Sequence, residues 1–344
     1  MLPTSAPSDL RLFPLPDGEV GAGEPPRQPR RRRRGRAPRR PGPLLLAVDG
    51  NGLAHRAFHA VGGADGEPGA ATGRVLAMLA KIAAEVQPTA CVVGFDDPIQ
   101  SVRRRRHPPY KASRPPKPDE LVELLDELPG LLRQLGLCVV VPDGLEADDV
   151  LGSAAALASR RVVAATLATG DQDAFGLVRP TVRVLLLVAG GRVEQVSPSW
   201  LRARYGVGPE QYLEFAALRG DSSDCLPGVR GVGAVTAAKL LTAYPNVEAA
   251  LADPAGVAKL LGSWVAEALV TQRATYELNR ELMTIRTDLP LDQAACNRAL
   301  DRRGVVETLA ERGLEDLALR FLGGFALLGR AAWRLSPGPL DHKE

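Results

Sequence analysis

Nine acidic residues between positions 49 and 224 stand at the ends of short apolar stretches or beside glycine turns. They are Asp49, Asp96, Glu146, Asp148, Asp149, Asp171, Asp173, Asp221 and Asp224. In "GDQDAFGLV", a single residue separates Asp171 from Asp173, so their carboxylates repel each other and tend to take up protons. Hard divalent cations remove that conflict, and oxygen ligands without a Cys/His set favour Mg²⁺ or Mn²⁺ over zinc. The pattern therefore indicates a site for divalent metal ions.

Each acid taken alone has a plainer interpretation. An aspartate after a strand is commonly a turn residue or a helix cap. Asp221 and Asp224 are three residues apart, so on a helical turn they either face one way as ligands or serve as an N-cap and a first-turn acid. The recurrence of acids after successive strands favours the metal site.

The segments that position these acids have the pattern of an α/β protein. Short apolar strands over "LLLAVD", "ACVVG", "LCVVV" and "VVAATLAT" alternate with helical stretches at 72–86 and 120–135, and "GLEADDVLGSAAALAS" predicts another helix. This alternation predicts a mainly parallel central sheet flanked by helices. The functional crevice of such a sheet lies outside the carboxyl ends of its strands. We therefore expect the acids that follow the strands to converge in one crevice.

A glycine-rich hairpin follows the last acidic pair. "PGVRGVGAVTAAKLL" places Gly228, Gly231 and Gly233 before a helix expected from about Ala234, which carries Lys239. Glycines let backbone N–H groups approach an oxyanion, and the N-terminus of a helix adds a favourable dipole. The spacing is typical of a helix-hairpin-helix, which grips a nucleic-acid backbone without reading bases. The alternative is a glycine-rich connection between packed helices.

The segment 101–120 is strongly basic. "SVRRRRHPPYKASRPPKPDE" contains four consecutive arginines, then Tyr110, Lys111, Arg114 and Lys117, with five prolines. A basic segment with an embedded aromatic residue can neutralise phosphates and stack on a base, whereas charge patterning alone is equally typical of a solvated loop. A phosphodiester that approaches nearby carboxylates needs cations, which favours the nucleic-acid role.

Composition sets further limits on the class of protein. A chain of 344 residues with 45% hydrophobic residues can form a sizeable core. No apolar run is long enough to span a bilayer, and the N-terminus lacks the apolar core of a signal peptide. Cys91, Cys138, Cys225 and Cys296 are scattered without CxxC spacing, which indicates a reducing compartment and neither a zinc site nor a disulfide framework.

The first 43 residues differ from the rest. They contain ten arginines and no lysine, are rich in Pro and Gly, and have almost no apolar periodicity, which predicts a disordered tail. Its arginines could hold phosphates at low salt. The alternatives are a solvated tail without a role, or a start codon assigned too far upstream.

The stretch from about Leu44 to Leu328 resembles the bacterial 5′ nuclease family, the flap endonucleases and 5′→3′ exonucleases that also form the N-terminal domain of DNA polymerase I. The resemblance rests on "LLLAVDGNGLAHRAFHA", "FDDP", "VRRRRHPPYKASR", "GLEADDVLG", "TGDQDAFGLV" and "GDSSDCLPGVRGVGAVTAAKLL", in the family's order and spacing. It implies a PIN-like core with a helical arch and a C-terminal helix-hairpin-helix subdomain. The expected boundaries are 1–43 for the tail, 44–218 for the core with the arch at about 101–120, 219–328 for the subdomain and 329–344 for a C-terminal tail.

The resemblance also implies roles for single residues. Asp49, Asp96, Glu146 and Asp148 match the acids around a first metal ion, and Asp171, Asp173 and Asp221 match those around a second, with Asp149 and Asp224 close by. The basic residues matched to the scissile phosphate are Arg56, Lys111 and Arg114 as catalytic cations and Arg103 as a DNA contact. Tyr110 matches an aromatic residue of the arch through which a 5′ single strand passes. Gly228, Gly231, Gly233 and Lys239 match the duplex-binding element, which in relatives often holds K⁺.

The implied activity is metal-dependent hydrolysis of DNA near the junction of single strand and duplex, as a 5′→3′ exonuclease or flap endonuclease in replication or repair. Two Mg²⁺ or Mn²⁺ ions about 4 Å apart would serve it, without a covalent enzyme intermediate. The expected partner is DNA with 5′ single-stranded ends or flaps, and the expected enzyme is a cytoplasmic, nucleoid-associated monomer. Two alternatives are a catalytically weak structure-selective DNA-binding protein and a related nuclease that acts on RNA.

Three positions depart from the family pattern. Cys225 stands beside Asp224 where relatives usually have Asn, so the local hydrogen bonding is expected to differ. The four successive arginines at 103–106 make the base of the arch more basic than is usual. The Arg-rich tail has no family counterpart.

Overall fold

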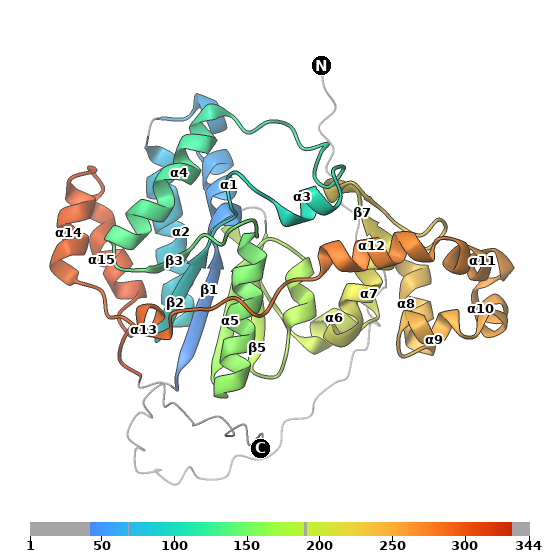
Figure 1. The fold of residues 1–344 in the computed structure, drawn as a ribbon. Coiled ribbons are helices and arrows are strands. Elements are labelled where there is room, and N and C mark those ends of the chain that lie inside the picture. The colour runs from blue at the N-terminus through green and yellow to red at the C-terminus, as the bar shows by residue number, and fades with distance from the viewer. Residues whose placement is uncertain (1–41, 68, 189–190, 332–344) are drawn as a thin grey trace, which may run out of the picture.

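A twisted six-stranded sheet forms the centre of the protein, with strand order β3-β2-β1-β4-β5-β6. The structure is a computed structural model that describes residues 42–67, 69–188 and 191–331 (Figure 1). The strands are β1 (Leu44–Asp49), β2 (Ala90–Gly94), β3 (Cys138–Val140), β4 (Ala164–Thr169), β5 (Val182–Leu187) and β6 (Val193–Val196). All neighbouring pairs are parallel except β5 and β6. The prediction of a mainly parallel sheet is confirmed.

Helices cover both faces of this sheet, and each face has its own apolar core. Leu46 and Val48 of β1 face one core, whereas Leu45 and Ala47 face the other, as the period of two along a strand requires. The first core is covered by α1 (Gly50–Ala60), α2 (Ala70–Val86) and α4 (Asp119–Gln134). The second is covered by α5 (Ala147–Arg161), α6 (Pro198–Tyr205) and α7 (Pro209–Arg219). The helices expected at 72–86 and 120–135 correspond to α2 and α4.

A helical subdomain extends from the sheet after α7 and lies at the right of Figure 1. It begins with a short antiparallel pair, β7 (Gly220–Asp221) and β8 (Leu226–Pro227), around the 3₁₀ turn η4 (Ser222–Asp224). The glycine hairpin follows, and the helix expected from about Ala234 begins there. The helices of this part are α8 (Ala234–Ala243), α9 (Val247–Leu251), α10 (Pro254–Leu261), α11 (Ser263–Thr271) and α12 (Arg273–Met283).

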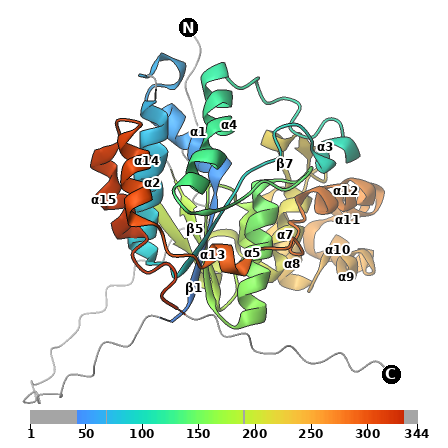
Figure 2. The ribbon, with the colours of Figure 1, turned by 60° about the vertical axis from the view of Figure 1, so that its left-hand side comes forward.

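The chain then returns to the sheet, which corrects the expected subdomain boundary of 219–328. After α12 it runs along α5 to α13 (Gln293–Cys296), α14 (Arg302–Ala310) and α15 (Glu315–Gly324). Both views show α14 and α15 beside α2, on the opposite side of the molecule from α8 to α11 (Figures 1 and 2). Phe321 and Leu322 of α15 belong to the same apolar core as α2. Periodicity identifies such an apolar helix face but not the partner that buries it, so the return could not be predicted.

The remaining elements are short. They are the helix α3 (Val102–Arg106) and the 3₁₀ helices η1 (Gly63–Asp65) and η2 (Asp173–Leu177). Among the described residues, no helix is both long and apolar enough to cross a membrane. The expected tails at 1–43 and 329–344 lie outside the described residues, apart from 42–43 and 329–331.

Candidate active site

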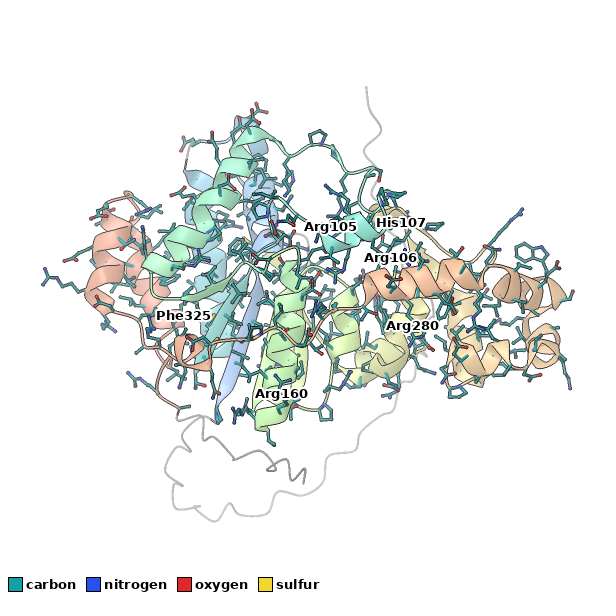
Figure 3. All side chains as sticks on the ribbon, viewed as in Figure 1. Arg105, Arg106, His107, Arg160, Arg280 and Phe325 are labelled. Carbon is teal, nitrogen blue, oxygen red and sulfur yellow. The ribbon has the colours of Figure 1, made fainter. Side chains whose placement is uncertain are left out.

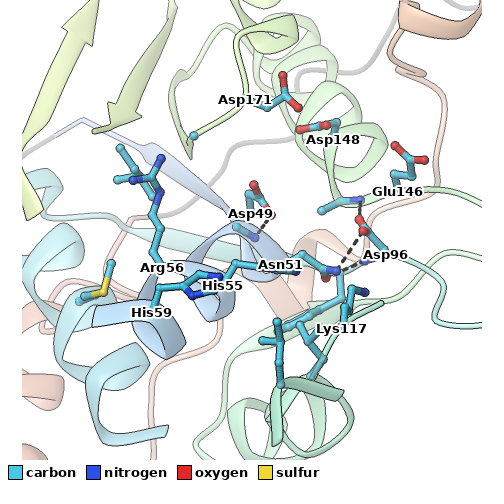
Figure 4. A pocket seen from close by; sticks show the side chains of 18 of the residues that line it. Asp49, Asn51, His55, Arg56, His59, Asp96, Lys117, Glu146, Asp148 and Asp171 are labelled. Atoms are coloured by element: carbon cyan, nitrogen blue, oxygen red, sulfur yellow. Dashed lines mark hydrogen bonds between the residues drawn. The ribbon is translucent and has the colours of Figure 1, made fainter. Parts of the chain in front are cut away.

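The ends of three parallel strands and the start of α5 bring predicted acids to one cavity of about 2620 Å³. Asp49 is the last residue of β1, Asp96 follows β2, and Asp171 follows β4. Asp148 lies in the first turn of α5, and Glu146 directly precedes that helix. Figure 4 shows these acids around a shared space, with Arg56 on its other side. All five acids line the cavity.

Four of these acids have no cationic partner among the described residues. Burial, together with the charges of Asp96 and Asp171, raises the pKa of Asp49 to about 6. Burial and the neighbouring acids Asp171 and Asp49 raise the pKa of Asp148 well above its ordinary value. The Oδ1 atom of Asp148 is buried and has no hydrogen-bond partner. The pKa values of Asp96 and Asp171 are also raised, first by burial. We call Asp49, Asp96, Asp148 and Asp171 the unpaired acids.

The backbone and polar neighbours hold the unpaired acids in place without neutralising them. Asp49 accepts hydrogen bonds from Gly52 N–H (2.7 Å) and from the Thr169 hydroxyl (3.0 Å). Asp96 accepts from Ala147 N–H (2.9 Å) and from the side-chain amide of Asn51 (2.9 Å). Sequence reasoning missed Asn51 and Thr169, which hold Asp96 and Asp49 in place through these hydrogen bonds. The only signal for Asn51 was its place in "DGNG", directly after a strand.

Three further acids surround this group at the base of the helical subdomain. The pKa of Asp173 is raised well above its ordinary value by burial and by Asp171, Asp224 and Asp221. Asp221 accepts hydrogen bonds from Ser223 N–H (2.8 Å) and from the Ser223 hydroxyl (2.7 Å), as the cap of η4. The cap interpretation of Asp221 is therefore observed, and the same carboxylate still contributes to the negative field at Asp171 and Asp173.

The unpaired acids fit a hard divalent cation by their chemistry. Their ligand atoms are all oxygens, their pKa values are raised, and one buried oxygen of Asp148 lacks any donor. In the described ranges no three acidic, histidine or cysteine side chains lie close enough to one another to hold one ion, so the carboxylates would have to draw together around a bound cation. The carboxylates thus form a region of excess negative charge and do not form a closed ligand cage.

A second set of acids near the cavity is neutralised by cations. Asp149 is fully buried and accepts two hydrogen bonds from the guanidinium of Arg103, both of 2.8 Å. It also accepts from the backbone N–H groups of Arg286 (2.9 Å) and Glu146 (3.1 Å). Each of its two carboxylate oxygens therefore accepts two hydrogen bonds from other groups of the protein. These contacts correct two predictions, that Asp149 is a metal ligand and that Arg103 is a DNA contact. The carboxylate of Asp149 and the guanidinium of Arg103 bind each other instead.

Lys111 and Tyr110 both point at Glu146. Lys111 Nζ lies 2.9 Å from Glu146 Oε2, and the Tyr110 hydroxyl donates to the same oxygen at 3.2 Å. Burial is the largest single influence on the pKa of Lys111 and lowers it, but Glu146, Tyr110 and Asp224 together outweigh it, so the net pKa is raised and the ammonium stays charged. Tyr110 is only 4% exposed, so its ring has no free face for a base. The predicted stacking role of Tyr110 is therefore corrected to a structural one. We call Glu146, Asp149 and Asp224 the paired acids.

The basic segment 101–118 docks on η4 through its second half. Lys111 N–H donates to the Asp224 carbonyl (3.0 Å), and Arg114 forms an ion pair with the Asp224 carboxylate. Ser113 N–H donates to Cys225 Sγ (3.3 Å), and the Cys225 thiol lies 2.9 Å from the Ser113 hydroxyl. These bonds from Ser113 lower the pKa of Cys225. Cys225 thus joins the arch segment to the second acidic pair, and the expected difference from relatives at this position stays a prediction.

The arginine run does not act as one block. Arg103 is buried against Asp149, whereas Arg106 forms an ion pair of 2.6 Å with Glu281 of α12. Figure 3 shows Arg105 and Arg106 at the end of α3, with His107 directly after it, above the helix that carries Arg280. Arg104 and Arg105 line the cavity. Only part of the run therefore remains available to a phosphate.

Arg56 on α1 lines the cavity, and its guanidinium has no carboxylate partner among the described residues. It packs against Gly170, where a Cβ would collide with its guanidinium. Burial lowers its pKa and the charge of Asp49 raises it, and the net pKa is lowered. His55, which sequence reasoning missed, lies beside it (Figure 4), and burial and Lys117 lower the pKa of His55 to about 4.

The predicted hairpin glycines lie at the start of the helical subdomain. Gly231 has φ +79°, and a Cβ on Gly228 would overlap the carbonyl of Arg219. Gly233 precedes the first turn of α8, and Lys239 is exposed on that helix. The hairpin therefore needs glycine at Gly228 and Gly231 for steric and conformational reasons, and the predicted approach of its backbone to a phosphate stays a prediction.

Two family models match the chain in tandem. The first is "5'-3' exonuclease, N-terminal resolvase-like domain" over residues 44–206, and the second is "5'-3' exonuclease, C-terminal SAM fold" over residues 207–303. DNA polymerase I of Mycobacterium tuberculosis H37Rv is 37% identical over 257 residues, which are 73% of this chain and 28% of the polymerase. Thermostable DNA polymerase I of Thermus aquaticus is 34% identical over 271 residues, 78% of this chain and 32% of the polymerase. The chain thus spans about a third of these relatives or less.

Solved structures share the fold at low sequence identity. T5 5'-exonuclease with bound zinc has a TM-score of 0.59 and 19% identity, and the match covers 81% of this chain and 98% of that one. The catalytic core of Rad2 in complex with DNA substrate has a TM-score of 0.54 and 15% identity, covering 81% and 92%. Flap endonuclease-1 from Methanococcus jannaschii has a TM-score of 0.51 and 16% identity, covering 83% and 93%.

Proposed function

The chain belongs to the bacterial 5′–3′ exonuclease family, and from that premise we propose that it is a structure-selective nuclease. It hydrolyses DNA phosphodiesters near the junction of single strand and duplex, as a 5′→3′ exonuclease or flap endonuclease. The observation that carries this proposal is the group of unpaired acids in a large cavity that also contains Arg56 and Lys111. The negative charge suits divalent cations, and the cations of the wall suit a phosphodiester.

The proposed cofactor is a pair of Mg²⁺ or Mn²⁺ ions. Asp49, Asp96 and Asp148 would hold the first with Glu146 beside it, and Asp171, Asp173 and Asp221 would hold the second with Asp224 beside it. When bound, such ions lower the pKa of the attacking water and stabilise charge on the phosphoryl and leaving oxygens. The zinc ions bound to T5 5'-exonuclease support a metal-dependent reaction.

The protein's own side chains would position the phosphate. Arg56 is half-buried, free of any described ion pair and adjacent to Asp49 and Gly170, so it would bind a phosphoryl oxygen. Lys111 is held in its charged state by Glu146 and lines the same cavity. Arg114 joins the cavity to Asp224, so it would respond to the charge at the second metal position.

The glycine hairpin with Lys239 would bind the backbone of the duplex next to the cleavage site. Its exposed N–H groups and the N-terminus of α8 suit phosphates, and its carbonyl groups suit a K⁺ ion. DNA in the Rad2 complex supports this partner. With DNA as substrate, the proposal places the protein in the cytoplasm with the nucleoid, as a monomer.

A labelled 5′-flap DNA tests the proposal. We expect cleavage near the junction that depends on Mg²⁺ or Mn²⁺ and leaves a 5′ phosphate, and a loss of cleavage in Asp171→Ala. Asp316→Asn, an exposed acid on α15, serves as the matched control and should cleave like the parent. Cleavage without metal, or equal cleavage by Asp171→Ala, would refute the proposal. Binding without cleavage would support the DNA-binding alternative, and faster cleavage of an RNA flap would support the RNA alternative.

A further inference from the structure

Trp264 on α11 packs directly on the glycine hairpin, although 33 residues separate it from Gly231. A Cβ on Gly231 would overlap the indole ring, so the ring fills the space that a side chain would otherwise occupy. The φ of +79° at Gly231 also belongs to the left-handed region, where glycine is strongly favoured. Trp264 nevertheless remains 50% exposed, so its ring covers the hairpin and faces solvent as well.

Arg230, the residue before Gly231, is held by two contacts from the same part of the subdomain. Its guanidinium lies over the Trp264 ring, 5.8 Å from the centroid. Its backbone N–H donates to the side-chain carbonyl of Gln272 at 3.0 Å. The guanidinium is exposed and forms no ion pair with a described carboxylate, so its N–H groups remain free for a ligand. A guanidinium stacked on an aromatic ring keeps its in-plane donors available.

We propose that Trp264 and Gln272 are positioning residues that hold the hairpin in its DNA-binding form, and that Trp264 directs Arg230 at a phosphate of the duplex. This inference rests on the proposed function, because it assigns the duplex-binding side chains of the same enzyme. A glycine-rich loop without side-chain support is flexible, and ordering it on binding weakens affinity. The indole and the Gln272 amide order the loop before DNA arrives.

Duplex binding by the full-length chain tests the inference. Fluorescence anisotropy of a labelled 5′-flap duplex is measured over a range of salt concentrations, with Ca²⁺ in place of Mg²⁺ to prevent hydrolysis. We expect Arg230→Ala to weaken binding about fivefold and to reduce the salt slope by about 1. Trp264→Ala should weaken binding about tenfold and reduce the slope equally, because it removes the support of the same phosphate contact.

The double variant separates positioning from an independent contact. If Trp264 acts through Arg230 and the loop, Trp264→Ala/Arg230→Ala should bind no more weakly than Trp264→Ala alone. Val270→Ala, which removes an equally exposed apolar side chain from the same helix, is the control and should bind like the parent. In cleavage assays with Mg²⁺, Trp264→Ala should raise KM and leave kcat unchanged, since the acids and cations of the cavity are untouched.

The outcomes distinguish failure of this inference from failure of the proposed function. A parent protein that does not bind the duplex contradicts the proposed function. A parent that binds, with Trp264→Ala binding equally well or with additive losses in the double variant, overturns the inference alone. If Trp264→Ala melts at a lower temperature than the parent, Trp264→Phe and Gln272→Ala decide the question. Both should retain the fold and show intermediate losses of affinity, and unchanged affinity in both would overturn the inference.

Discussion

Asp148 and Asp149 are neighbours in the first turn of α5, and the protein treats their carboxylates in opposite ways. Asp149 is fully buried and receives four hydrogen bonds, two from Arg103 and one each from the backbones of Arg286 and Glu146. Asp148 has a buried oxygen with no donor and a strongly raised pKa, caused by burial and by Asp171 and Asp49.

The same contrast separates the unpaired acids from the paired acids as groups. The paired acids tie the arch segment to α5 through Arg103 and Lys111 and to η4 through Arg114. Asp149 also holds the segment after α12 through the N–H of Arg286. The unpaired acids accept only neutral hydrogen bonds, such as those from Thr169, Asn51 and Ala147 N–H, and their mutual repulsion opposes folding at neutral pH. One group therefore builds the cavity wall, and the other supplies the charge inside it. Variants of each group should fail in different measurements.

The largest expected effect is on stability, in Asp149→Asn. The amide cannot neutralise Arg103, so a buried guanidinium loses its charge partner and the unfolding free energy should fall by about 3–5 kcal/mol. Urea denaturation of the metal-free protein measures it. The matched control is Asp288→Asn, which removes an exposed ion pair with Arg286 (2.7 Å) and should change the unfolding free energy far less. Equal losses in the two variants would show that Asp149 is no structural anchor.

The next effect is on catalysis, in Asp148→Asn. Removing one carboxylate from the group that would hold metal should reduce flap cleavage by about 10²- to 10³-fold. The metal-free variant should be more stable than the parent at pH 7, because the unfavourable ionisation of Asp148 is gone. Cleavage assays measure the expected loss of activity, and urea denaturation measures the expected gain in stability. A variant that loses activity and also loses stability would place Asp148 with the paired acids.

Local patterns were enough to predict the centre of the fold. The strands β1 to β4 and the helices α2, α4 and α5 follow from apolar runs and periodicity, and the start of α8 follows from the glycine spacing before it. The convergence of Asp49, Asp96 and Asp171 follows from a topological rule, because parallel strands end at one edge of the sheet. None of these predictions required knowledge of a side-chain partner.

Predictions failed where a partner distant in sequence decides the outcome. Arg103 and the backbone of Arg286 meet Asp149 across 46 and 137 residues, and nothing in "EADD" distinguishes that acid from Asp148. Tyr110 has the sequence context of an exposed basic loop, yet Glu146 and the core bury it. The return of α14 and α15 to α2, and the packing of Trp264 on Gly231, likewise depend on long-range contacts.

The pH dependence of stability sharpens the contrast at Asp49. Its folded pKa of about 6 exceeds the ordinary value of 3.8, so the folded protein holds a proton that the unfolded chain releases. As pH rises from about 4 to about 6, this group therefore destabilises the fold by up to about 3 kcal/mol, and above that window the loss is constant. In Asp49→Asn the side chain cannot ionise, so this loss of stability does not occur, and the amide can still cap α1. Its stability advantage over the metal-free parent should grow across this window.

Denaturation of both proteins at several pH values measures this difference directly. Saturating Mg²⁺ should reduce or reverse the advantage of Asp49→Asn, because the ion stabilises only the parent's ionised carboxylate. A difference that is independent of pH between 4 and 6 would mean that Asp49 is neutralised in the folded protein and belongs with the paired acids.

The smallest effect is expected at Cys225, beside the paired acid Asp224. Cys225 has φ +58°, a region that Asn tolerates better than most residues, so Cys225→Asn should relieve local strain. The same change removes the contacts of the thiol with Ser113. Because Lys111 and Arg114 still hold the arch segment to Asp224, we expect little change in stability and a change in flap cleavage of less than about threefold. Denaturation and cleavage assays check both expectations.

A large loss of cleavage at unchanged stability would mean that the thiol contact, and not the ion pairs of the paired acids, sets the position of the arch.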